Sequence, residues 1–111
     1  MPLFAVLDVE TTGLSSAQGD RVVELAVVVL DEQFRVVRIF DSLVHPQRSI
    51  PSYVTQIHGI SNHAVSTAPK FAEILPDLMT CIAGTTHLVA HNISFDLGFL
   101  RAEFDACGVP M

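Results

Sequence analysis

The alternation of apolar and polar residues divides the first part of the chain into three runs that are typical of β-strands. Residues 3–9 are almost wholly apolar, and residues 21–30 form a nearly continuous β-branched run, as in strands that are buried on both faces. Residues 34–44 form the third run, after the polar connection 31–33. Because so brief a connection joins only antiparallel neighbours, we predict that the second and third strands pair as a hairpin.

Residues 45–65 show little periodicity and contain Pro46, Pro51 and Gly59. We predict a long ordered loop here. Loops of this length inside compact domains usually have a functional role.

Apolar residues at helical spacing begin near Pro69 and predict an amphipathic helix that ends at Gly84. Pro76 falls inside this helix, so we expect a kink or a restart there, because proline lacks the N–H that the helix needs. The apolar stripe consists of Phe71, Ile74, Leu75, Leu78, Met79 and Ile82.

A short fourth strand is predicted at residues 86–91, followed by a second helix. Asn92 or Ser94 can cap this helix, and Gly108 and Pro110 end it. The resulting order β-β-β-α-β-α is that of an α/β domain. The apolar face of the second helix carries Leu97, Leu100 and Phe104.

Length and composition place the chain, residues 1–111, in a single domain. Half of its residues are hydrophobic and 16% are charged, which excludes disordered and fibrous proteins. Three antiparallel strands followed by a crossover helix and a parallel strand usually continue into a further strand and helix. We therefore expect the domain to be incomplete at its C-terminus.

The net charge narrows the classes of partner. Six basic and twelve acidic residues give a formal net charge of −6, which argues against broad electrostatic binding to nucleic acid or to an anionic membrane. It leaves room for carboxylate metal sites. Cys81 and Cys107 lack zinc-site spacing, and we find neither a signal peptide nor a bilayer-spanning run. We predict a soluble, cytoplasmic protein with no membrane partner.

The first strand ends in two acids, Asp8 and Glu10, within the stretch LDVETTGL. Side chains alternate faces along a strand, so both carboxylates project to the same side. Like charges this close disfavour each other unless a cation lies between them. The strand end therefore either lies in open water or binds a cation.

Asp96 follows the fourth strand, in the first turn of the second helix, and sites in α/β sheets collect at the carboxyl ends of strands. If the fourth strand lies beside the first, Asp8, Glu10 and Asp96 converge. Three such oxygen ligands suit Mg²⁺ or Mn²⁺, and two of these ions about 4 Å apart can clamp a scissile phosphate. In the alternative interpretation, the first two acids form a polar strand end and Asp96 complements the helix dipole.

Three stretches together resemble a known family: LDVETTGL, IHGIS and AHNISFDLGFL. In order and spacing they are similar to the motifs of the DnaQ-like 3′→5′ exonucleases of the DEDD superfamily, which include the proofreading epsilon subunit of bacterial DNA polymerase III. The resemblance covers nearly the whole chain. It implies a ribonuclease H-like α/β fold, a mixed sheet of order 3-2-1-4, and removal of nucleotides from single-stranded DNA ends in proofreading or repair.

The resemblance also implies roles for individual residues. Asp8 and Glu10 would ligate the main Mg²⁺ or Mn²⁺ ion, with Asp8 bridging to a second ion that Asp96 helps to hold. Nine further residues are expected around the 3′-terminal nucleotide. Thr11, Thr12 and Leu14 would contact it, His58, Gly59 and Ile60 would line its base and sugar pocket, and His91, Asn92 and Phe95 would shape the turn before the last helix.

The sequence departs from the family in one respect, since no third motif H-x-x-x-x-D follows the second. That motif supplies a general-base histidine and a last metal ligand. Loss of a general base alone costs on the order of 10²–10⁴ in rate. We therefore predict that these 111 residues are inactive alone and need a further segment or chain.

Two other functions remain open. The substrate can be RNA, as in related exoribonucleases, or the domain can be a non-catalytic module that binds a DNA polymerase, a helicase or a fused partner. The outer edge of the fourth strand would be unpaired, so we also predict a homodimer through this edge.

Two residues have an open role at this point. Glu24 interrupts an apolar strand, and we expect it to be buried against Arg21 or a backbone donor, because an unpaired buried carboxylate is costly. Tyr53 either stacks on a base or packs the long loop.

Overall fold

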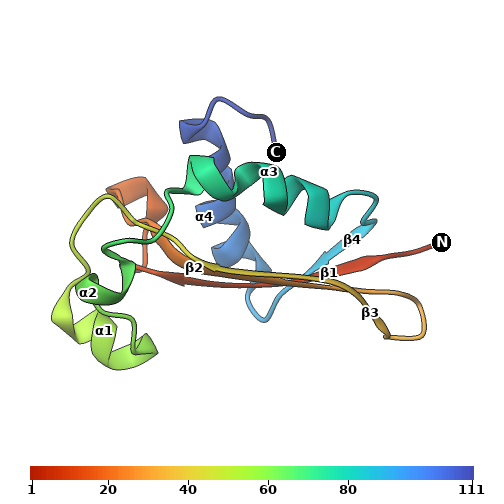
Figure 1. Ribbon diagram of the computed structural model, residues 1–111, viewed down its shortest axis with the longest axis horizontal. Helices are drawn as coiled ribbons and strands as arrows, with labels where there is room; N and C mark the ends of the chain where they lie inside the picture. Colours follow the sequence, from red (N-terminus) through yellow and green to blue (C-terminus); the bar gives the residue numbers. More distant parts are fainter.

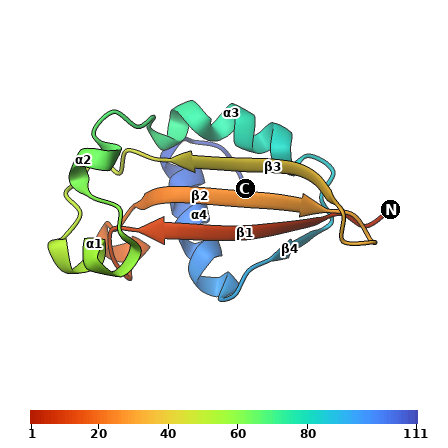
Figure 2. The same ribbon diagram turned by 60° about the horizontal axis from the view of Figure 1, so that its bottom comes forward.

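The computed structural model describes residues 1–111 and contains one mixed sheet of four strands. These are β1 (Phe4–Thr11), β2 (Val22–Leu30), β3 (Val36–Leu43) and β4 (His87–Val89). Their order is β3-β2-β1-β4 (Figure 2), and β4 is parallel to β1 while the other neighbours are antiparallel. The mixed sheet and its predicted order are confirmed.

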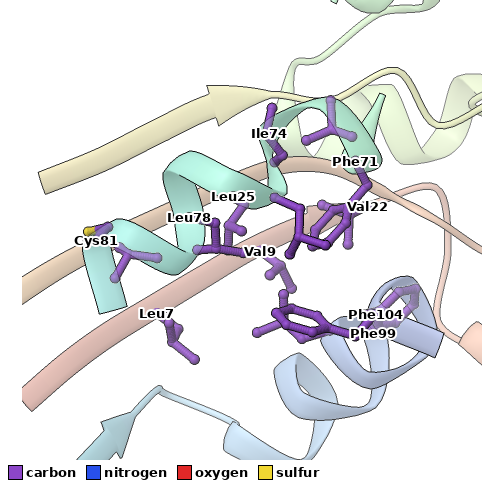
Figure 3. Packing of buried hydrophobic residues seen from close by; sticks show 14 of the residues in the cluster. Leu7, Val9, Val22, Leu25, Phe71, Ile74, Leu78, Cys81, Phe99 and Phe104 are labelled. Carbon is purple, nitrogen blue, oxygen red and sulfur yellow. The ribbon is translucent and has the colours of Figure 1, made fainter. Parts of the chain in front are cut away.

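Two helices, α3 (Phe71–Ile82) and α4 (Ile93–Ala106), cover one face of the sheet (Figure 1). The main core lies between them and the strands (Figure 3), where the rings of Phe71 and Phe104 lie 5.9 Å apart. The buried side chains of β1 alternate as a half-covered strand requires. On this strand Ala5, Leu7, Val9 and Thr11 are buried, whereas Asp8 and Glu10 belong to the opposite face.

The segment that we predicted as a long loop contains two short helices, so that prediction is wrong in part. They are α1 (Ser52–His58) and α2 (Asn62–Val65), and they lie beyond the carboxyl end of β1 (Figure 1). Gly59 ends α1 with a positive φ of 80°, a conformation that glycine adopts without strain. A small second core beneath these helices consists of Val23, Ile50, Val54, Ile60 and Val65.

One extra residue in β2 joins the two cores. Glu10 pairs with Glu24, but Thr11 pairs with Val22, so Val23 has no partner on β1. This is a β-bulge, which lets two adjacent residues both be buried. Val22 belongs to the main core and Val23 to the second core.

Helix α3 runs unbroken through Pro76, so the predicted restart does not occur. Its first turn is held by a capping interaction in which the Lys70 N–H donates to the Glu73 carboxylate at 2.9 Å. Helix α4 begins after Asn92, whose side chain makes no capping hydrogen bond. None of the helices is both long enough and apolar enough to cross a membrane.

Candidate active site

Two of the predicted metal ligands come from the end of β1. Strand alternation places Asp8 and Glu10 on the face of the sheet opposite to α3 and α4, and Asp8 is the more exposed of the two. Burial raises the pKa of Glu10, and the charges of Asp8 and Asp96 raise it further, while His58 acts in the opposite direction. Glu10 therefore lies within electrostatic reach of both other acids.

Parallel pairing of β1 with β4 brings the third predicted ligand to the same place. The chain leaves β4 at Val89, turns, and enters α4, which carries Asp96 in its first turn. Asp96 is only 6% exposed. Burial and the charge of Asp8 raise its pKa, and hydrogen bonding to backbone N–H groups, including that of Val9, opposes the rise. The last helix thus sets a buried carboxylate against the end of β1.

The donor chemistry of these three residues fits Mg²⁺ or Mn²⁺, because all three are hard carboxylate oxygens. A divalent cation would also relieve the repulsion that raises the pKa values of Glu10 and Asp96. Their side chains are neighbours at one rim, but no three His, Cys, Asp or Glu residues stand close enough together to hold an ion. Binding would therefore require the carboxylates to move closer together.

Glu24 extends this acidic rim across the sheet, and its predicted partner is wrong. It lies opposite Glu10 on β2, and the carboxyl group of Asp41 on β3 is close enough to act on its charge. Burial and the nearby Asp41 raise the pKa of Glu24, and Glu10 and Asp8 add to this. Its expected partner, Arg21, faces the other way.

Arg21 instead forms a bidentate pair with Glu103 of α4. Its Nε and Nη2 donate to the two carboxylate oxygens at 2.9 and 2.7 Å, and the Val22 N–H donates to the same carboxylate at 3.2 Å. Glu103 is 2% exposed. This pair fastens the start of β2 to the last helix.

A pocket of about 260 Å³ lies beside Glu10, between the end of β1, helix α1 and the first turn of α4. Its walls are mainly apolar. Four of the predicted substrate-binding residues line it, namely Thr11, Leu14, His58 and Phe95. The others that line it, besides Glu10, are Val9, Gly13, Tyr53, Val54 and Ile57.

Five predicted substrate-binding residues lie outside this pocket. Thr12 is fully buried, and its hydroxyl donates to Asp20 at 2.9 Å. Gly59 ends α1, and Ile60 belongs to the second core. The remaining two, His91 and Asn92, are exposed in the turn before α4.

The hydroxyls of Thr11 and Thr12, two residues expected to contact the nucleotide, are already engaged within the protein. Thr11 donates to the Gly13 carbonyl at 2.6 Å, and the Thr12 hydroxyl is used as described above. Contacts from this turn to a ligand would therefore come from its backbone and from Leu14, which is 88% exposed.

His58 fastens α1 to the end of β1 through both ring nitrogens. Nδ1 accepts the Ile60 N–H at 3.0 Å, so Nε2 carries the proton and donates to the Thr11 carbonyl, also at 3.0 Å. The imidazole therefore holds the wall of the pocket and has no free nitrogen for proton transfer.

Sequence reasoning missed Ile57 and left Tyr53 undecided. Both lie on α1, four positions apart, and both are largely exposed on the pocket wall. An i, i+4 apolar pair is a helix signal, but the segment was interpreted as a loop. The exposure of Tyr53, 65%, excludes a role as a packed core residue.

Comparisons with known proteins point to one family. The family model RNase_T, described as exonuclease, matches residues 5–110. The 3′-5′ exonuclease DinG of Bacillus subtilis (strain 168) is 38% identical over 108 residues, which are 97% of this chain and 11% of that protein. The DNA polymerase III subunit epsilon of Treponema pallidum (strain Nichols) is 41% identical over 104 residues, 94% of this chain and 47% of that protein. The chain spans less than half the length of these relatives.

Solved structures agree on the fold. The crystal structure of E. coli Exonuclease I in complex with a 5cy-dA13 oligonucleotide has a TM-score of 0.86 and 21% identity, covering 99% of this chain and 25% of that one. The product-bound structure of exonuclease I has the same TM-score at 19% identity, covering 99% of this chain and 27% of that one. The predicted ribonuclease H-like fold is confirmed.

Proposed function

The chain belongs to the RNase_T family of exonucleases, and we propose that it forms the metal-binding and nucleotide-binding part of a 3′→5′ exonuclease acting on single-stranded DNA ends. The observation that carries this proposal is the apolar pocket directly beside Glu10. A terminal nucleotide in this pocket would lie against the rim of carboxylates. A nucleotide end needs both features, because its base is apolar on its faces and its phosphate needs a cation.

Asp8, Glu10 and Asp96 would hold Mg²⁺ or Mn²⁺ at this rim. When bound, such ions neutralise the charge of the scissile phosphate and favour ionisation of the attacking water. The overall reaction adds water across the last phosphodiester bond. The water oxygen bonds to phosphorus, the penultimate 3′ oxygen leaves with a proton, and a nucleoside 5′-monophosphate is released.

The pocket walls bind without reading the identity of the base. The polar groups of Thr11 and His58 are taken up by backbone partners. Tyr53 and Phe95 supply aromatic faces, and stacking on such faces tolerates every base. The geometry therefore supports a terminal nucleotide pocket that accepts all four bases.

His58, the histidine at the pocket, cannot serve as the general base of the reaction, because both of its ring nitrogens are engaged. The sequence also contains no third motif. We propose that these 111 residues do not cleave DNA alone, and that the missing histidine and aspartate come from a further segment or chain. The names of the relatives, which include a DNA polymerase III subunit, support a partner or fused domain in DNA replication.

Mn²⁺ titration by calorimetry tests the proposal. We expect binding to the wild-type chain, loss of binding in Asp8→Ala, and unchanged binding in Asp77→Ala, which removes an exposed acid on α3. The wild-type chain should also bind a single-stranded oligonucleotide with a free 3′ end, more tightly with Mn²⁺ than with chelator. It should release no mononucleotide from that end.

A different outcome would favour another function. No Mn²⁺ binding at millimolar concentration would refute the nuclease proposal and favour a non-catalytic interaction module, a role consistent with the missing third motif. Trimming of a 3′ end by the purified 111-residue chain, at a rate that Asp8→Ala abolishes, would refute the proposed dependence on a further segment.

A further inference from the structure

The turn between β1 and the short helix η1 (Ser16–Gln18) is held by one carboxylate, that of Asp20. Its Oδ1 accepts the Thr12 hydroxyl at 2.9 Å, and its Oδ2 accepts the Ser15 N–H at 3.2 Å. The two ends of the turn are therefore tied to the same group. The Asp20 N–H also donates to the Ser15 carbonyl at 3.0 Å, which closes the turn from the backbone side.

The same carboxylate fills the space beside Gly13. A Cβ at this position would lie 2.4 Å from Oδ2 of Asp20 and 2.7 Å from both its Cγ and its Oδ1. These distances are far shorter than any van der Waals contact. A methyl group at this position would therefore force the carboxyl group of Asp20 to move.

Asp20 is itself held from a second direction. Nη1 of Arg48, in the segment between β3 and α1, lies 3.4 Å from Oδ1. The Thr12 hydroxyl that donates to Asp20 also accepts the Arg21 N–H at 3.1 Å. One side chain thus joins the turn after β1, the start of β2 and the segment that leads to α1.

Gly13 and Leu14 line the nucleotide pocket, and Leu14 projects into solvent with little to hold it except the turn. We propose that Asp20 is a positioning residue that sets Leu14 against the base of the terminal nucleotide. This inference rests on the proposed function. Asp20 does not contact the nucleotide and acts only through the turn, so its loss should weaken nucleotide binding and leave the metal rim intact.

The test compares Asp20→Ala with the wild-type chain in two binding assays. Fluorescence anisotropy with Mn²⁺ measures the Kd for a labelled single-stranded oligonucleotide with a free 3′ end, and calorimetry measures Mn²⁺ binding. We expect the oligonucleotide Kd to rise about tenfold and the Mn²⁺ affinity to change less than about twofold. Asp20→Asn keeps one acceptor oxygen, so its oligonucleotide Kd should lie between those of the wild type and Asp20→Ala. Asp77→Ala is the control for removal of one negative charge.

An oligonucleotide whose last residue is abasic separates positioning from general damage to the fold. Leu14 would contact the terminal base, so Asp20→Ala should have little effect on the affinity for the abasic end. A variant that is merely destabilised would weaken both oligonucleotides alike. Gly13→Ala perturbs the same turn in a second way, because its methyl group must displace the Asp20 carboxylate. It should weaken binding in the wild-type chain and have a smaller effect in the Asp20→Ala background.

The possible results distinguish this inference from the proposed function. If the wild-type chain binds the oligonucleotide and Asp20→Ala binds it as tightly as Asp77→Ala does, Asp20 has no positioning role, and the nuclease proposal is unaffected. Equal losses on the normal and abasic ends would also overturn the role. If the wild-type chain binds Mn²⁺ but no oligonucleotide, the proposed pocket is wrong, and the role of Asp20 fails with it.

Discussion

Replacing Glu103 with alanine is expected to destabilise the domain more than any change of an exposed charge. The wild-type carboxylate accepts hydrogen bonds from two guanidinium nitrogens of Arg21 and from the Val22 N–H. It is almost fully buried. The substitution would leave a guanidinium and a backbone donor without their partner at the junction of β2 and α4.

The expected cost follows from these three hydrogen bonds. Removing one partner of a buried ion pair costs about 3–5 kcal/mol, and an unsatisfied buried N–H costs about 1–3 kcal/mol. The Arg21 side chain is 30% exposed, so water recovers part of its solvation. We therefore expect a loss of about 2–4 kcal/mol, a large share of the roughly 5–15 kcal/mol that stabilises a domain.

Urea unfolding followed by circular dichroism measures this loss. With a slope of about 1.5 kcal/mol/M, the midpoint should fall by about 1–3 M. Glu103→Gln keeps one acceptor oxygen, so its urea midpoint should fall by less. Asp105→Ala, an exposed acid on the same helix, is the matched control. A midpoint for Glu103→Ala equal to that of Asp105→Ala would show that the pair contributes nothing and would refute this reasoning.

Two further predictions concern the pocket and the core. Tyr53→Ala should weaken binding of a single-stranded 3′ end, measured by fluorescence anisotropy, by about 1–3 kcal/mol. Tyr53→Phe keeps the aromatic face and should bind as the wild type does. Equal weakening in both variants would instead indicate a role for the hydroxyl. Burial raises the pKa of the Cys81 thiol above its usual value of 9.0, and only the thiolate is nucleophilic. Iodoacetamide should therefore modify half-buried Cys107 first. The rate of labelling of Cys81 should still increase as the pH is raised above 9. Mass spectrometry that finds Cys81 modified first at pH 8 would contradict this.

The sheet was predictable because its signals are local and strong. The β-branched run of β2 and the short polar stretch 31–33 after it leave one arrangement, an antiparallel hairpin, although β3 begins at Val36, two residues later than predicted. The parallel placement of β4 was also expected, but this strand has only three residues. Helix α1 was missed because it has only seven residues between Pro51 and Gly59, so its one i, i+4 apolar pair, Tyr53 and Ile57, is too short a pattern to separate from a loop.

The sequence predicted the parts of the site that strand alternation alone determines. It did not predict side-chain pairs between residues that are far apart in the sequence. Asp8 and Glu10 share a face because of the period of the strand alone. The partner of Arg21 lies 82 residues away, on an element whose placement the sequence does not specify. The sequence contained one indication of this buried pair. Glu103 lies three positions after Leu100 and therefore on the apolar face of its helix. A charged residue at such a position indicates a buried partner.

The single unpaired residue of β2 has a consequence for the stability of the pocket wall. Because of it, the wall formed by α1 is supported by a separate group of five apolar side chains, and only Val23 among them belongs to the sheet. Swinging α1 and α2 outward would break this small group and leave the interior between the sheet and its two long helices untouched. Local opening of this kind costs much less than global unfolding. Such an opening would widen the pocket from the side of α1, without displacing the strands that carry Asp8 and Glu10.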